Sequence, residues 1–109
     1  MAVTYKVLGQ LHPASATPST LYTTPNGTQA VCSTMTVCNL GAVPINYRIA
    51  IRPSGASLDH LHYIVYDSYV NIGDSVFLTL GITLGSTDVV TVYSGSGDVT
   101  FNLYGSEMT

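Results

Sequence analysis

The sequence predicts an all-β protein, a single-domain antiparallel β-sandwich of jelly-roll or Ig-like type with about eight short strands. Apolar residues recur with a period of two along most of the chain, and no segment of useful length shows a helical period. Gly, Pro, Asn and Asp interrupt this pattern at intervals of roughly 8 to 12 residues, as in β-sandwiches. With 109 residues the chain encloses one core, so residues 1–109 are expected to form one domain.

The expected strands, in chain order, are 4–9, 21–24, 29–39, 45–52, 61–66, 75–82, 89–93 and 99–103. The linker at residues 11–20 contains Pro13 and Pro18, which oppose a helix, and it is long enough to cross between two sheets. The Asn26-Gly27 pair predicts a hairpin, because both residues tolerate positive φ. Gly81 lies inside a strand pattern and predicts a bulge.

Strand 45–52 shows the cleanest alternation of the chain. One face carries Ile45, Tyr47, Ile49 and Ile51, and the other carries Asn46, Arg48, Ala50 and Arg52. This pattern is typical of an antiparallel strand that is buried on one side.

The two cysteines, Cys32 and Cys38, lie in strand 29–39 at an even spacing. Regular alternation would place them on one face, about 20 Å apart at roughly 3.3 Å per residue. A disulfide needs Cα atoms within about 7 Å, so we expect no bond between them. We interpret both as reduced, small apolar residues, with a bond between subunits or a redox role as the alternatives.

Charged residues make up 8% of the chain, with three basic and six acidic residues and a net charge of -3. An ordinary domain carries about 25%. Three basic residues cannot form the cationic surface that nucleic acid requires, so no nucleic-acid partner is expected. No segment has the roughly 20 apolar residues of a membrane span, and the first residues do not resemble a secretory signal. We therefore expect no membrane partner and synthesis in a cytosol.

The segment Asp59-His60-Leu61-His62 is the one candidate metal site. On a strand, His60 and His62 would share a face, with His12, Asp67 or a symmetry-related copy as further ligands. Zinc requires three or four ligands, so we favour a polar pair on a solvated or interface face. Since no nucleophile elbow, phosphate loop or paired acids can be placed, we expect no cofactor, no catalytic residue and no enzyme activity.

Two sets of side chains are candidate interface residues. Tyr63, Tyr66 and Tyr69 cluster after the histidines and suit either a protein interface or stacking on sugars. We expect Arg48 and Arg52 each to have an acidic partner, and at least one of them to dock onto an acidic patch of a neighbouring subunit. The alternative is a solvated arginine pair of little energetic value.

Several segments resemble a family of short virion structural proteins of tailed phages, and together they cover essentially the whole chain. They are Tyr5-Lys-Val-Leu-Gly-Gln10, Leu21-Tyr-Thr-Thr-Pro25, residues 31–41, Tyr47-Arg-Ile-Ala-Ile-Arg-Pro-Ser-Gly-Ala56, His62-Tyr-Ile-Val-Tyr-Asp67, Leu78-Thr-Leu-Gly-Ile-Thr-Leu84, Asp88-Val-Val-Thr-Val-Tyr93 and Phe101-Asn-Leu-Tyr-Gly-Ser-Glu107. The resemblance implies a component of the virion that is assembled in the host cytoplasm. It brings no active site with it.

Two functions remain open on these grounds. The first is an accessory protein that decorates or cements the capsid, or caps part of the particle, in contact with the major capsid protein or a tail protein. The second is a receptor- or carbohydrate-binding head or adaptor of a tail or tail fibre. The low charge favours the first, and it also predicts a homo-oligomer, with a trimer as the expected state.

Overall fold

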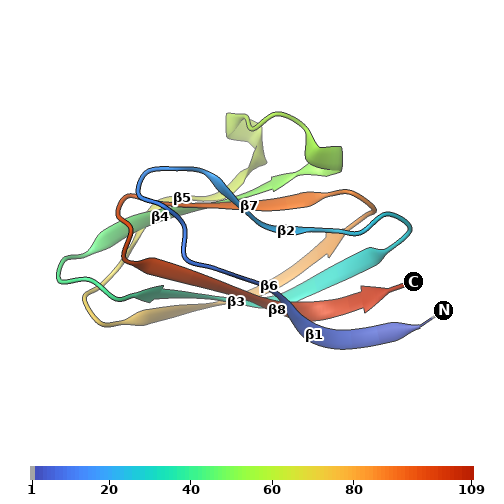
Figure 1. Cartoon of the computed structure of the whole chain (residues 1–109), viewed down its shortest axis with the longest axis horizontal. Helices are drawn as coiled ribbons and strands as arrows, with labels where there is room; N and C mark the ends of the chain where they lie inside the picture. The colour runs from blue at the N-terminus through green and yellow to red at the C-terminus, as the bar shows by residue number, and fades with distance from the viewer. Residues whose placement is uncertain (1) are drawn as a thin grey trace.

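Two four-stranded antiparallel sheets pack face to face in the computed structural model, which describes residues 2–109 (Figure 1). Sheet A contains, in spatial order, β1 (Val3–Leu11), β8 (Val99–Met108), β3 (Gln29–Asn39) and β6 (Ser75–Leu84). Sheet B contains β2 (Ser19–Thr23), β7 (Val89–Ser94), β4 (Ile45–Arg52) and β5 (Tyr63–Val70). The predicted β-sandwich is confirmed. No helix within residues 2–109 has the length and apolar character needed to cross a membrane.

The pairing of the strands identifies the sandwich as a jelly roll. Antiparallel ladders join β4 to β5, β3 to β6, β2 to β7 and β1 to β8. These pairs are nested around the β4–β5 hairpin, as if one long hairpin had been wound into two sheets. Because an Ig constant domain divides its seven strands four and three, the eight strands of this chain follow the jelly-roll alternative.

The core lies between the two sheets and is formed by the inward side chains of both. Its largest fully buried members are Phe101, Met35, Ile49, Leu84 and Leu103. In β4 the predicted alternation is confirmed, since Ile45, Tyr47 and Ile49 are buried and Ile51 packs against the core. The Tyr47 ring meets the Phe101 ring edge-on at 6.5 Å between centroids, which joins sheet B to sheet A.

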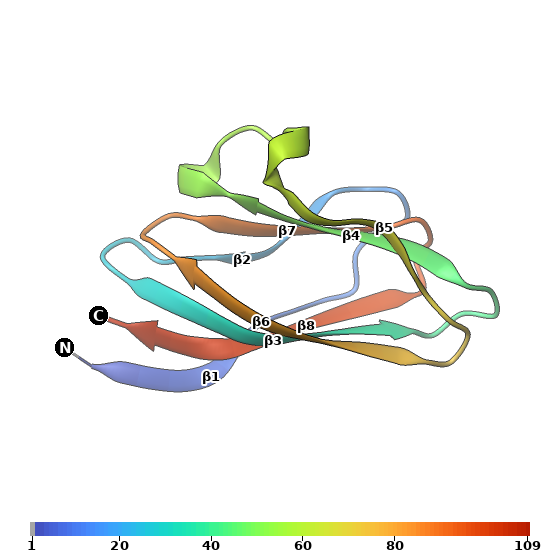
Figure 2. The ribbon, with the colours of Figure 1, turned by 180° about the vertical axis from the view of Figure 1, so that it is seen from behind.

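Two expectations for the connections need correction. The strand expected at residues 61–66 begins at Tyr63 and continues to Val70, because residues 60–62 form a 3-10 turn, η2 (His60–His62). The Asn26-Gly27 turn is present, with φ of 78° at Gly27, but it joins β2 of sheet B to β3 of sheet A. It is therefore a connection between sheets and not a hairpin. The linker after β1 crosses between the sheets as predicted (Figure 2).

A bulge in β3 changes the faces of the two cysteines. The register against both neighbouring strands shifts between Cys32 and Thr34, opposite the predicted bulge at Gly81 in β6. Cys32 is therefore turned into the core with 1% exposure, whereas Cys38 is half-buried next to the inward Val37. The expectation that the two share a face is wrong, and both thiols are free.

A polar network closes the sandwich near the chain termini. Tyr22 of sheet B donates a hydrogen bond to Glu107 of sheet A at 2.5 Å, and Lys6 donates to the same carboxylate at 3.1 Å. These bonds hold the pKa of Glu107 below its ordinary value, the Tyr22 bond first. Burial, followed by the bond to Glu107, raises the pKa of the Tyr22 hydroxyl. The two charged residues of the sheet A strands are thus paired with each other; the Glu107 side chain is 14% exposed, whereas that of Lys6 remains 45% exposed.

Candidate functional site

Arg48 is the centre of a polar and aromatic cluster on the outer face of sheet B. Its guanidinium donates from Nε to Asp67 Oδ1 at 2.6 Å and from Nη2 to Oδ2 at 3.1 Å. Asn46 donates to the same Oδ1 at 3.0 Å. The Arg48 bond, followed by the Asn46 bond, lowers the pKa of the Asp67 carboxyl. The acidic partner expected for Arg48 is therefore present within its own chain.

A backbone bulge positions Asp67 for this contact. In the β4–β5 ladder Arg48 pairs with Tyr66 and Tyr47 with Ser68, which leaves Asp67 as the extra residue. Asp67 has a φ of 56°, a left-handed conformation that is uncommon for a residue other than glycine and better tolerated by Asp and Asn. The bulge turns the carboxylate towards Arg48 on the outer face.

Two tyrosine rings enclose the guanidinium of Arg48. Its central carbon lies 4.3 Å from the ring centroid of Tyr66 and 4.3 Å from that of Tyr93. The Tyr63 ring meets the Tyr66 ring at 4.9 Å and 80°, and His60 lies 6.1 Å from the Tyr66 ring. The planar guanidinium of Arg48 is thus stacked between two tyrosine rings, and its N–H donors are hydrogen-bonded to Asp67.

On a regular strand, the three-residue spacing would place Tyr66 on the opposite face from Tyr63 and Tyr69. In β5 they pair with Ala50, Arg48 and Asn46, which all lie on the outward side of β4. Two register shifts, one on each side of Val65, supply the extra residues that keep all three tyrosines on one face. Tyr69 is 66% exposed and Tyr66 is 51% exposed. Their use as an interface stays a prediction.

Arg52 has a different role from that of Arg48. Its Nε donates to Thr91 Oγ1 at 3.0 Å, and its Nη1 donates to the carbonyls of Ala56 at 2.9 Å and Gly55 at 3.3 Å. Residues 53–62 form a flap over the outer side of sheet B, which Figures 1 and 2 show standing above that sheet. Arg52 anchors this flap. Within residues 2–109 it forms no ion pair, so the acidic partner expected for it is not found.

The two histidines of the candidate metal site lie in the flap and not on a strand. His62 is buried, and its Nδ1 accepts a hydrogen bond from the backbone N–H of Asp59 at 3.0 Å. Asp59 in turn caps the same turn by accepting from the N–H of His60. The further ligands considered lie elsewhere, since Asp67 is bound to Arg48 and His12 contacts the carbonyl of Gly97. Residues 2–109 contain no group of three or more His, Cys, Asp or Glu side chains placed for a metal ion.

The outer face of sheet A carries no charged side chain in any of its four strands. The register places on it, strand by strand, Val3, Tyr5, Val7 and Gln10; Thr100, Asn102, Tyr104 and Ser106; Val31, Thr34, Thr36 and Cys38; and Ser75, Phe77, Thr79 and Thr83. Tyr5 on β1 is 84% exposed and Phe77 on β6 is 71% exposed. The two edge strands thus present large aromatic side chains beside a centre of hydroxyls and amides. Sequence reasoning missed this face, because a low overall charge does not indicate where charges are absent.

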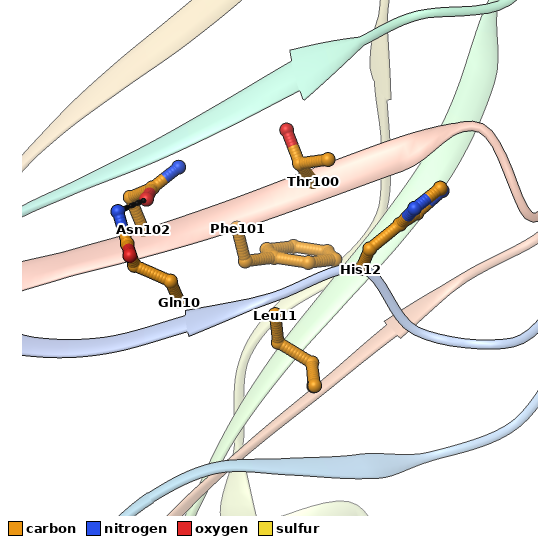
Figure 3. A pocket seen from close by; sticks show the side chains of 6 residues that line it. All are labelled: Gln10, Leu11, His12, Thr100, Phe101 and Asn102. Carbon is orange, nitrogen blue, oxygen red and sulfur yellow. Dashed lines mark hydrogen bonds between the residues drawn. The ribbon is translucent and has the colours of Figure 1, made fainter.

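A shallow hollow of about 360 Å³ lies where β1 and β8 meet (Figure 3). Its lining consists of Gln10, Leu11, His12, Thr100, Phe101 and Asn102. Gln10 donates to the side-chain oxygen of Asn102 at 2.8 Å, which fixes the amides at one side of the hollow. A second hollow, of about 630 Å³, lies beside Tyr5 and Tyr104. Both are open depressions at the outer face of sheet A, and Lys6 contributes to the lining of the second.

No family model matches the sequence, and no curated protein matches it. Among solved structures the chain is similar to one in the structure of the infectious bursal disease virus Gx strain, with a TM-score of 0.56 and 11% identity over 97% of this chain and 32% of that one. Two structures of a pentameric capsid protein isolated from metagenomic phage sequences give TM-scores of 0.41 and 0.35, at 14% and 12% identity. Each of these covers 97% of this chain, and 64% and 65% of theirs. This chain therefore spans about a third of the viral chain and just under two thirds of the other two. The likeness to the viral chain shows a shared fold.

Proposed function

We propose that the chain is a structural component of a virus particle and works by protein–protein packing, without catalysis. The observation that carries this proposal is the uncharged outer face of sheet A with its protruding Tyr5 and Phe77. Desolvating hydroxyls and apolar groups costs far less than desolvating charges, so such a face suits close contact with other proteins. Large exposed apolar side chains on an otherwise uncharged face favour a protein interaction site.

The fold supports the same proposal. Jelly rolls with eight strands form capsid domains of many viruses, and also lectin domains. The similarity to a chain of the infectious bursal disease virus structure extends over 97% of this chain. Together with the resemblance to tailed-phage proteins, it favours a small accessory protein that decorates or cements a phage capsid or caps part of the particle. The expected neighbours are further copies of the chain and the major capsid protein or a tail protein.

Quantitative mass spectrometry of gradient-purified particles tests this proposal. Because the chain has three basic residues, chymotryptic peptides are better suited than tryptic ones. We expect its peptides at a fixed ratio to the major capsid protein in every particle fraction. Hundreds of copies per particle would indicate head decoration, and low tens in multiples of three or six would indicate the tail. Peptides that are abundant in infected lysate but absent from purified particles would overturn the proposal.

The aromatic cluster on sheet B favours a second candidate, a carbohydrate-binding adaptor. Exposed tyrosine rings stack on sugars, and Tyr66 and Tyr69 are both more than half exposed. In a glycan-array experiment this function predicts binding that is lost in Tyr69→Ala. Binding to no glycan, together with incorporation into particles, would exclude it in favour of the packing role.

A further inference from the structure

We propose that two copies of this chain pair through the outer faces of sheet A, about a two-fold axis that runs parallel to the strands. This inference deepens the proposed function, and it rests on that function for its biological meaning. It identifies the face used, the occupant of that face and the side chain that enters the hollow at the β1–β8 edge.

The charges of the chain favour a second copy as the occupant. The strands of sheet A contain two charged residues, Lys6 and Glu107, which pair with each other at 3.1 Å and which the register places on the opposite face from Tyr5 and Ser106. The other charged side chains lie on sheet B, in the flap or in turns. Two such faces can therefore approach without placing like charges opposite each other, although each chain has a net charge of -3. A strongly charged partner would find no complementary group on this face.

The register supplies shape complementarity between the copies. Phe77 pairs with Thr36, Thr36 with Asn102, and Asn102 with Gln10, so Phe77 and the hollow lie in one row at opposite edges of the sheet. A two-fold axis parallel to the strands exchanges the two edges and keeps each residue at its level along the strands. The rotation therefore places Phe77 of the second copy over the hollow beside Gln10 and Asn102. The symmetry creates this contact twice.

The dimensions of the face suit a stable pair. Four strands at about 4.8 Å spacing, and about nine residues at roughly 3.3 Å, give a flat footprint near 600 Å². This is the scale of the roughly 800 Å² that each partner buries in a standard interface. A two-fold axis along the strands keeps the strand directions of the two copies aligned, and aligned packing, with strand directions within about 30° of each other, is one of the two common modes of sheet stacking. The pair is a two-fold contact, and the trimer expected from the sequence stays a prediction.

Sedimentation equilibrium of the purified chain tests the pairing. The wild type should form dimers with a Kd that changes little between low and high salt, because no charges face each other. Phe77→Lys should raise the Kd about tenfold or more, which is the effect of replacing a residue that contributes much of the binding energy. Leu61→Lys is the matched control, since Leu61 is 77% exposed but lies in the flap, and it should leave the Kd unchanged. A strict monomer, or equal effects of both substitutions, would overturn the inference.

A charge pair across the interface makes the test specific for this geometry. Gln10→Glu alone should weaken the dimer, and the double variant Gln10→Glu/Phe77→Lys should restore it, with a Kd that now rises with salt. If the double variant dimerises no more tightly than Phe77→Lys, the two-fold arrangement is contradicted. Melting temperatures of all variants show whether they fold, and Phe77 is exposed enough to be replaced. Sedimentation measures self-association and particle composition measures incorporation, so either proposal can fail alone.

Discussion

Arg48 shows how the surroundings of one residue alter the role expected from its sequence position. The sequence predicts that at least one of Arg48 and Arg52 docks onto an acidic patch of a neighbouring subunit. In the structure the fork of Arg48 is occupied by Asp67 and both of its faces by tyrosine rings. The residue is therefore a structural partner on sheet B, and docking by Arg48 or Arg52 stays a prediction.

Replacing Arg48 should now lower stability. Each arginine–tyrosine stack contributes about 0.5–1 kcal/mol at an exposed site, so Arg48→Ala should cost about 1–2 kcal/mol. Arg48→Lys keeps the charge but loses the planar fork and the stacking, so it should recover little of this loss. Thermal unfolding of the three proteins measures the effect. A melting temperature of Arg48→Ala equal to that of the wild type would show that the cluster contributes nothing.

Glu107 should make the fold sensitive to acid. Its folded-state pKa is lowered by the bonds from Tyr22 and Lys6, so its contribution is fully present above the unfolded value of about 4.3. That contribution is lost as the pH falls through the lower folded-state pKa. When the pH is lowered from about 5 to about 3, Glu107→Gln should therefore lose less stability than the wild type. Parallel pH profiles of the two proteins would contradict this account.

At the scale of the single strand, alternation predicts much of the structure and bulges limit it. The bounds of β3 and β4 agree with the sequence pattern, because turn residues delimit both strands and the inward positions of β4 are apolar; Ala50, on the outward side of β4, is also buried. The extra residues that form the bulges in β3 and β5 cannot be predicted from the alternation of apolar and polar residues. Ser33 is compatible with a regular strand, and Asp67 follows the strand expected at residues 61–66, so neither is recognised as a bulge residue before its neighbours are known. For this reason sequence reasoning placed both cysteines on one face and could not place the three tyrosines together.

The bulge in β3 makes the two thiols chemically different. Cys32 is 1% exposed and burial raises the pKa of its thiol to about 11, whereas Cys38 is half-buried near the outer face. When the chain is dilute enough to be monomeric, a thiol reagent should modify one cysteine per native chain, at Cys38, and both after unfolding. Mass spectrometry of the labelled peptides assigns the site. Equal labelling of both cysteines in the native protein would place the bulge elsewhere.

For the whole molecule, the sequence predicted a sandwich of about eight strands but left jelly-roll and Ig-like types open. Pairing of β1 with β8 and of β2 with β7 joins residues from opposite ends of the chain, and periodicity carries no information about such partners. The Asn26-Gly27 turn was assigned to a hairpin for the same reason. The uncharged face likewise depends on the strand order of sheet A, which places four strands without outward charges side by side.

We propose that the outer face of sheet A is the surface that packs within the particle. Hydroxyl-radical footprinting of purified particles and of the isolated, diluted chain tests it directly. We predict that Tyr5 and Phe77 are oxidised in the dilute chain and protected in particles, while Leu61 and Tyr69, with 77% and 66% exposure, react in both. Equal oxidation of Tyr5 and Phe77 in the two samples, or protection confined to Tyr66 and Tyr69, would contradict the claim and move the interface to sheet B.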